Sequence, residues 1–240
     1  MATLPELIDA FAAKGKVLLI GGLAVIAHGL TRTTKDGDIW YEPKNSAAEW
    51  ADDALQVMKD FHQCSFYDLA GKRRIPAERL LEIVESSGVV RVVGLDMDLD
   101  VFRIPHNMDA EDFEGAWRRS LPCKGSYRLM DEVDLALTKF DTGRSLDISD
   151  SSFLEGKAND KFGVIAASAD FDTVRSLLDR IENHILLAKA LENPDEAVVK
   201  LAIERLKVMA DEGNPFAEEI LAAFVTRKEA QPCDWDSRQS

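Results

Sequence analysis

The sequence is poor in the residues that mark disulfide-bonded, zinc-binding or membrane-spanning proteins. Its 240 residues include three cysteines, which are far apart and match no Cys-x-x-Cys or Cys/His spacing. We therefore expect Cys64, Cys123 and Cys233 to be reduced thiols. No apolar run approaches the roughly 20 residues that span a bilayer, and the first residues lack a basic and apolar leader. These absences predict a soluble, cytoplasmic protein with no membrane partner.

Basic residues are scarce beside acidic ones. Lysine and arginine together number 29 against 43 acidic residues, which gives a formal net charge of −14. Because phosphate neutralisation dominates binding to long nucleic acids, this balance argues against a broad nucleic-acid-binding surface. A short basic patch at 72–74 is still compatible with holding an RNA end. Clustered acids make divalent cations natural partners.

The apolar pattern predicts an α+β fold, with strands and helices in the first part of the chain followed by an all-helical C-terminal region. Helical periodicity and strand-like runs alternate through the first 155 residues, and three amphipathic helices follow over 170–192, 195–212 and 215–229. Residues 156–169 are less periodic and richer in small residues, which is typical of a linker. We expect a domain over 1–155, a linker over 156–169, a helical region over 170–229 that could bind a protein partner, and a disordered tail over 230–240.

Two aspartates in a predicted strand over 36–41 are the first candidates for chemistry. Asp36 and Asp38 stand at positions i and i+2, so their carboxylates project from the same face about 7 Å apart. Divalent ions can bridge such a separation. In a chain with 43 acidic residues, an Asp-x-Asp pair could equally be a solvated strand face.

A glycine pair precedes these aspartates. A predicted buried strand over 16–20 ends at Gly21 and Gly22, and a helical pattern begins directly after it. A helix start without side chains lets a phosphate approach free backbone N–H groups. The alternative is that the glycines serve tight packing between strand and helix.

A strand predicted over 95–104 alternates apolar and acidic residues, which would place Asp96, Asp98 and Asp100 on one face. If this strand pairs beside the Asp36 strand, one of these acids completes a site for two metal ions. We favour Asp100, which precedes the most apolar end of the strand. Asp96 and Asp98 could instead protect an edge strand from aggregation.

The stretch VLLIGGLAVIAHGLTRTTKDGDIWY, from Val17 to Tyr41, resembles the signature of the polymerase-β-like nucleotidyltransferase superfamily. More narrowly, it is similar to a bacterial branch that includes AbiEii-type toxins and small uncharacterised relatives. Its RxTxDxD run is spelled here by Arg32, Thr34, Asp36 and Asp38. Weaker similarity continues through LDVFRIP, DFEGAW and DLALTKFDTGRSLDISD, so the resemblance covers about 130 residues.

The resemblance implies transfer of a nucleotidyl group from a nucleoside triphosphate to a hydroxyl acceptor, with Mg²⁺ or Mn²⁺ held by Asp36, Asp38 and Asp100. It also implies a nucleotidyltransferase-like mixed sheet with flanking helices, and a triphosphate that lies over Gly21 and Gly22. The family often has serine after the first glycine, where this chain has Gly22. The acceptor could be an RNA end, a protein or a small molecule, and many members of the branch belong to toxin–antitoxin or defence systems. The alternative is an inactive nucleotide-binding or partner-binding protein on the same fold.

Two cations are placed to meet the triphosphate. Arg32 lies in the loop before the aspartate pair, and Lys139 lies in the later similar segment. Arg32 could instead pair with a carboxylate, and Lys139 could be a helix-surface residue whose stem packs on the core. We interpret the remaining candidates as structural: His28, Trp40 and Trp117 as core residues, and Asp147 and Asp150 as helix-start or solvent-face acids. Trp40 has the alternative of stacking on a base.

Overall fold

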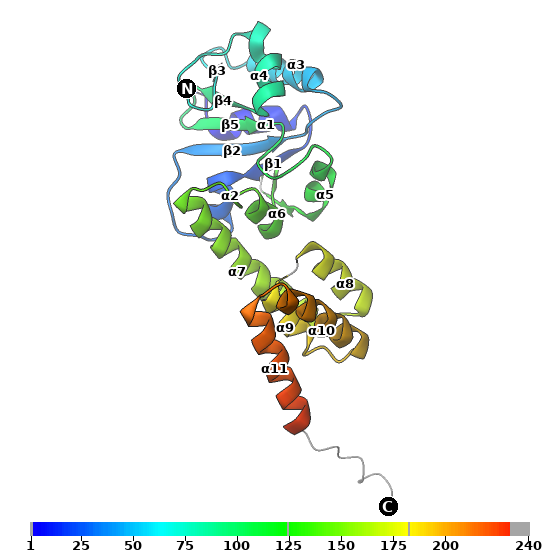
Figure 1. Cartoon of the computed structure of the whole chain (residues 1–240). Coiled ribbons are helices and arrows are strands. Elements are labelled where there is room, and N and C mark those ends of the chain that lie inside the picture. The colour runs from blue at the N-terminus through cyan, green and yellow to red at the C-terminus, as the bar shows by residue number, and fades with distance from the viewer. Residues whose placement is uncertain (1, 124, 182, 231–240) are drawn as a thin grey trace, which may run out of the picture. The chain divides into compact units, whose positions relative to one another are not determined.

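A computed structural model describes residues 2–123, 125–181 and 183–230 of the chain (Figure 1). The chain divides into two units, Met1–Glu155 and Gly156–Ser240. The first unit has a mixed seven-stranded sheet with flanking helices, and the described part of the second is helical. The predicted fold class is therefore confirmed. No helix of the described residues is both long and apolar enough to cross a membrane.

The sheet of the first unit has the order β3-β4-β5-β2-β1-β7-β6. Strand β2 pairs antiparallel with β1 and parallel with β5, so it lies inside the sheet. Strand β4 pairs antiparallel with both β5 and β3. The strands are β1 (Val17–Ile20), β2 (Asp36–Tyr41), β3 (Ser65–Tyr67), β4 (Val89–Val93), β5 (Asp98–Phe102), β6 (Leu121–Pro122) and β7 (Arg128–Leu129).

Helices and one 3-10 turn flank this sheet, and local sequence sets several of their ends. The side chain of Ser46 accepts the amide of Glu49, and Asp131 accepts that of Asp134, so each caps a helix start. These elements are α1 (Leu4–Ala12), α2 (Gly21–Ala27), α3 (Ala47–Met58), η1 (Ala77–Arg79), α4 (Leu80–Ser87), α5 (Asp112–Arg119) and α6 (Glu132–Leu137).

Helix α7 (Ser145–Ser168) begins in the first unit and continues into the second. The predicted linker over 156–169 is thus helical as far as Ser168. The low periodicity of this stretch reflects a helix with small residues on several sides rather than a loop. The second unit continues with α8 (Phe171–Arg180), α9 (His184–Ala190), α10 (Glu196–Asp211) and α11 (Pro215–Ala230).

Three further expectations need correction or lie outside the structure. The helix predicted over 170–192 is two helices, α8 and α9, and Asn183 caps the second one. The short strands β6 and β7 were not predicted, because two-residue strands leave no periodic pattern. Of the predicted tail, residues 231–240, with Cys233, lie outside the described residues, and Ala230 is the last residue of α11.

A single apolar core holds the sheet against the helices. Its largest side chains belong to β2 and α3, where Trp40, Tyr41 and Trp50 are fully buried. Trp40 contacts Phe113 edge to face, with ring centroids 5.0 Å apart. The alternation of β2 places Ile39 and Tyr41 on one face, and Asp36, Asp38 and the buried Trp40 on the other. The core roots the strand that carries the candidate acids.

Candidate active site

The candidate carboxylates lie side by side on two parallel strands. Asp36 of β2 stands in register with Asp98 of β5, and Asp38 stands in register with Asp100. The condition set by the sequence analysis, that the strand of Asp100 pairs with the strand of Asp36, is therefore met. Asp100 is only 3% exposed. The pairing brings the predicted third acid next to Asp38.

Asp96 does not join this group. The strand predicted over 95–104 begins only at Asp98, so Asp96 lies in a bend before it. Its carboxylate accepts the backbone N–H of Leu4 at 2.7 Å, which satisfies an amide in the first turn of α1. Asp96 therefore has a structural role at the start of α1, and the predicted run of three acids on one strand is wrong.

The glycine pair lies directly against Asp38. The amide of Gly22 donates to Asp38 Oδ2 at 3.3 Å, and a Cβ at Gly21 would fall 1.9 Å from the same oxygen. A Cβ at Gly22 would meet Thr34 Oγ1 at 2.7 Å and Arg32 Nη2 at 2.8 Å. Both glycines thus make room for site side chains. Gly21 thus lies close to the Asp38 side chain, and Gly22 lies close to the side chains of Thr34 and Arg32.

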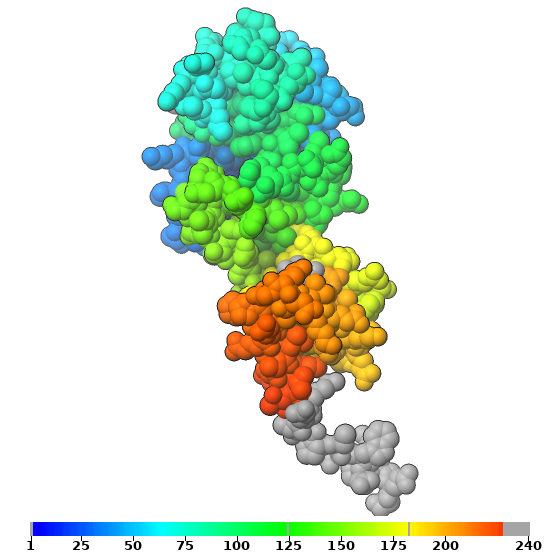
Figure 2. Space-filling view, in the orientation of Figure 1, coloured from blue at the N-terminus to red at the C-terminus, as the bar shows by residue number. Residues whose placement is uncertain are grey.

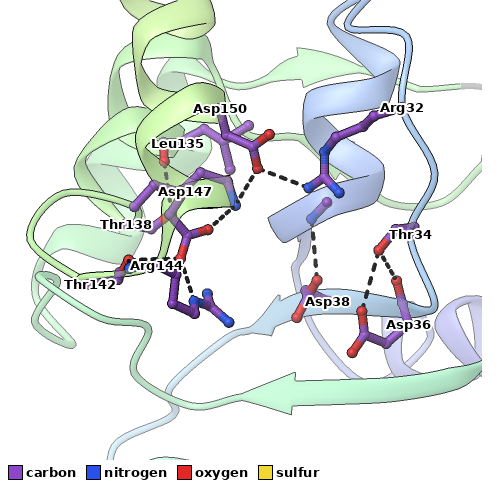
Figure 3. Close-up of polar contacts among 12 residues, drawn as sticks. Arg32, Thr34, Asp36, Asp38, Leu135, Thr138, Thr142, Arg144, Asp147 and Asp150 are labelled. Atoms are coloured by element: carbon purple, nitrogen blue, oxygen red, sulfur yellow. Dashed lines mark hydrogen bonds and ion pairs between the residues drawn. The ribbon is translucent and has the colours of Figure 1, made fainter.

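The predicted phosphate-binding cations meet at a buried acid (Figure 3). Arg32 Nη2 lies 2.8 Å from Asp150 Oδ2, and Lys139 Nζ lies 3.0 Å from the same oxygen. Lys139 Nζ also lies 3.1 Å from Asp147 Oδ1, which accepts through its other oxygen from Thr142 at 2.8 Å. The structure therefore brings Arg32 and Lys139 together, although 107 residues of sequence separate their positions.

Asp147 and Asp150 hold this arrangement, and the interpretation of them as solvent-face acids is wrong. Asp147 is 3% exposed and Asp150 is fully buried, near the start of α7. Lys139 is not a helix-surface residue either, since it follows α6 and is 7% exposed. Buried charges of this kind require partners of opposite sign. Spacing alone did not reveal those partners, because they come from distant parts of the sequence.

Arg91 is a site residue that the sequence analysis did not single out. It projects from β4 beside β5 and donates Nε to Asp100 Oδ1 and Nη2 to Asp100 Oδ2, both at 2.7 Å. The same Nη2 reaches Asp36 Oδ2 at 3.0 Å. The signal was a lone arginine in the apolar run VVRVV, since a charge inside a buried strand needs a partner.

The predicted site residues and Arg91 line one cavity of about 620 Å³ in the first unit. Its wall includes Gly22, Arg32, Asp38, Arg91, Asp100 and Lys139. Pro105, Leu69 and Leu146 add apolar wall beside the charged one. Figure 2 shows a recess on the first unit where blue and green segments meet. All seven predicted site residues line this cavity.

Of the three residues interpreted as core residues, His28 and Trp40 are buried, and Trp117 is partly buried against the core. His28 is 5% exposed, and its Nε2 lies 2.8 Å from the carbonyl oxygen of Met130. Trp40 is fully buried, and its indole N–H donates to the carbonyl oxygen of Arg103 at 2.9 Å. Trp40 thus belongs to the core, and stacking on a base does not fit its position. Trp117 lies partly buried against Phe113, with ring centroids 6.4 Å apart.

Electrostatic crowding distinguishes Asp38 from its neighbours. Burial, followed by the nearby charges of Asp100 and Asp36, raises the pKa of Asp38 to about 7. Burial also raises the pKa of Asp100, although its hydrogen bonds from Arg91 oppose the shift. The buried setting and the neighbouring carboxylates therefore disfavour the charged form of Asp38.

The contribution of Asp38 to the stability of the metal-free protein should fall as pH rises from about 4 to about 7. With a folded-state pKa of about 7 against an ordinary 3.8, Asp38 keeps its proton in the folded state after the unfolded state has released it. Ionisation therefore favours the unfolded state through this range, and the effect levels off above it. Urea unfolding in EDTA at several pH values measures the slope. Asp38→Asn should flatten it, and an unchanged slope in this variant would contradict the assignment.

Gly21→Ala is expected to displace Asp38 and to lower the free energy of unfolding by about 1–3 kcal/mol. Gly21 has φ +61°, and its added Cβ would overlap the Asp38 carboxylate. Gly156→Ala is the matched control, because nothing lies within 4 Å of a Cβ there and alanine favours the helix. Urea denaturation compares the two. Equal stability of Gly21→Ala and the parent protein would contradict the close approach.

The donor atoms of the site suit a divalent cation. Carboxylate oxygens are the ligands that Mg²⁺ and Mn²⁺ prefer, and Asp36, Asp38 and Asp100 supply them on adjacent strands. Within the described residues, however, no three acidic, histidine or cysteine side chains already converge as a ligand set. Arg91 lies between two of the three acids. The carboxylates thus supply the kind of donor atom that such an ion requires, and the Arg91 guanidinium contacts two of them.

Comparison with known proteins adds little to this geometry. No family model matches the chain, and no curated protein matches it significantly. Two solved structures from Helicobacter pylori are similar. JHP933 is 14% identical with a TM-score of 0.34, over 93% of this chain and 91% of that one. A protein described as a candidate nucleotidyltransferase is 15% identical with a TM-score of 0.34, over 92% and 93% of the two chains. At these TM-scores neither likeness establishes the fold or the activity of this chain.

Proposed function

We propose that this protein transfers a nucleotidyl group from a nucleoside triphosphate to a hydroxyl acceptor in a reaction that depends on Mg²⁺ or Mn²⁺. The observation that supports the proposal is the register of β2 and β5. It brings Asp38 next to Asp100, in a cavity that is also lined by the glycine pair, the buried Lys139 and the partly buried Arg32. A phosphoryl-transfer site needs this combination of clustered carboxylates and phosphate-binding groups.

In this proposal Asp36, Asp38 and Asp100 would hold the metal, which would stabilise negative charge on the attacking and leaving oxygens. Arg32 and Lys139 would neutralise the triphosphate, since both line the cavity and their ion pairs with Asp150 fix their direction. The Gly21–Gly22 turn would leave room for the phosphates. Asp100 would orient the acceptor hydroxyl and accept its proton.

Incubation of the protein with each labelled nucleoside triphosphate, Mg²⁺ and a cell lysate tests the activity and identifies the acceptor. The expected result is transfer of label to one class of macromolecule or small molecule, and its absence with EDTA. The double variant Asp36→Ala/Asp38→Ala is the control. Label transfer that survives both EDTA and the double variant would exclude this site as its source.

A second candidate is a nucleotide-binding or partner-binding protein that performs no transfer. The observation that favours it is Arg91, which already neutralises Asp36 and Asp100 without a metal. Isothermal titration of the four nucleotides with and without Mg²⁺ separates the two. Nucleotide binding that ignores both the metal and the acids supports the binding protein and rejects the enzyme.

The resemblance to the AbiEii-type branch extends the proposal to a role in a toxin–antitoxin or defence system. In that setting the helical unit would bind a protein partner in the cytoplasm. Exposed apolar side chains on α10 and α11, Val208, Phe216 and Val225, are compatible with such a contact.

A further inference from the structure

One nitrogen of Arg91 bridges two of the carboxylates that the proposed reaction assigns to a metal. Nη2 lies 2.7 Å from Asp100 Oδ2 and 3.0 Å from Asp36 Oδ2, while Nε lies 2.7 Å from Asp100 Oδ1. A divalent cation shared by Asp36 and Asp100 would lie between the same oxygens. The guanidinium and such an ion cannot both occupy that position.

Access to the two acids is unequal. The side chain of Asp36 is 35% exposed, whereas that of Asp100 is 4% exposed, and Arg91 engages both of the Asp100 oxygens. A cation can therefore approach Asp36 from solvent, but it can gain a full share of Asp100 only if the guanidinium withdraws. Charge-assisted, two-pronged pairs of this kind are among the stronger hydrogen-bonded contacts in proteins.

We propose that Arg91 competes with the metal: it neutralises Asp36 and Asp100 in the metal-free protein, releases Asp100 when a divalent cation binds, and then contacts a phosphate in the same cavity. This inference rests on the proposed function, because that function supplies both the cation and the phosphate. A guanidinium binds carboxylate and phosphate oxygens with the same paired geometry, so one side chain suits both states. Arg91 would thereby couple metal loading to nucleotide binding.

The surroundings of Arg91 allow this exchange without refolding. Its backbone is held in β4, between β3 and β5, so only the side chain needs to turn. A Cβ at Gly71 would come within 3.8 Å of Arg91 Cδ, so the turn at Gly71 lies over the stem rather than over the guanidinium. The guanidinium itself faces the cavity of about 620 Å³, which provides space for its new position.

The first experiment measures Mn²⁺ binding in the absence of nucleotide, by the loss of the free-ion EPR signal. Arg91→Gln should bind Mn²⁺ at least about tenfold more tightly than the parent protein, because no charged hydrogen bonds have to be broken. Lys35→Gln is the matched control, since it removes the same charge from an exposed position next to Asp36. Solvent screening should limit its effect to about twofold. Equal affinities for the two variants would overturn the competition.

Arg91→Gln leaves the buried Asp100 without its partner. A second variant and a direct measurement on the parent protein therefore test the proposal independently of how well Arg91→Gln folds. Arg91→Lys keeps a cation but cannot make the two-pronged contact, and its affinity for Mn²⁺ should lie between those of Arg91→Gln and the parent protein. In the parent protein, the NMR signal of the Arg91 Nε–H should shift on addition of Mg²⁺. A signal that stays unchanged at saturating Mg²⁺ would show that Arg91 keeps Asp100, against the proposal.

The outcomes separate this inference from the proposed function. If Arg91→Gln strengthens Mn²⁺ binding but the parent protein transfers no nucleotide, the competition stands and the enzymatic function falls. If nucleotide is transferred and Arg91→Gln leaves Mn²⁺ binding unchanged, the function stands and the competition falls. If neither the parent protein nor the variant binds Mn²⁺ at millimolar concentration, both are rejected.

Discussion

Asp38→Asn should reduce nucleotidyl transfer by at least about a thousandfold while leaving the protein folded. Asp38 lies between the other groups of the site, since the Gly22 amide donates to it and Asp100 stands in register beside it. An amide cannot contribute the negative charge that a divalent cation requires. Because the pKa of Asp38 is raised to about 7, loss of its charge should not destabilise the metal-free fold. Single-turnover label transfer, with saturating nucleotide, measures the effect.

Asp96→Asn is the control for this prediction. Asp96 shares the alternating acidic pattern with Asp98 and Asp100, but its carboxylate binds the Leu4 amide at the start of α1. The control should lose about 1 kcal/mol of stability, as for other helix-start contacts, and keep its transfer rate within about threefold. A large loss of transfer in Asp96→Asn, or an active Asp38→Asn protein, would refute the assignment of the site.

Asp150→Ala should lower the free energy of unfolding of the first unit by about 3–5 kcal/mol. Asp150 is fully buried and pairs with both Arg32 and Lys139, so its removal leaves two cations in the interior with less compensating charge. The buried Trp40 and Trp50 report unfolding of this unit through their fluorescence. Transfer should also fall, because the two cations lose the contact that fixes their direction towards the cavity.

Glu155→Ala is the matched control for Asp150→Ala, because Glu155 lies in the same helix and the same unit but is exposed. Its replacement should change stability by no more than about 0.5 kcal/mol. Urea denaturation followed by tryptophan fluorescence compares the two variants. A loss below about 1 kcal/mol in Asp150→Ala would mean that the ion pairs contribute little to the fold.

The sequence predicted the strands that carry the carboxylates because their patterns are local. The bounds of β2 agree with the predicted range 36–41, and the alternation around Asp36 and Asp38 correctly placed their side chains on one face. A capping residue such as Ser46 also allows the start of its helix to be predicted from the sequence. Each of these features depends on neighbours within a few residues in the chain.

The contacts made by buried charges could not be predicted in the same way. Arg91 reaches Asp36 across 55 positions, and Arg32 reaches Asp150 across 118. Such pairs depend on strand order and helix placement, which a periodic pattern does not encode. The same limit explains the error at Asp96, where the contact with the amide of Leu4, 92 positions away, replaces strand geometry.

The place of β2 inside the sheet has a consequence for how the acids and their arginine open to solvent. Asp38 lies on a strand that is hydrogen-bonded on both sides, so its amide exchanges with deuterium only when the sheet as a whole comes apart. Arg91 lies nearer the edge, where its outer neighbour is the three-residue β3. We expect fraying of the sheet to begin at that edge, next to the strand that carries Arg91. We therefore expect the backbone amides of β2 to exchange with deuterium more slowly than those of β4, the strand that carries Arg91.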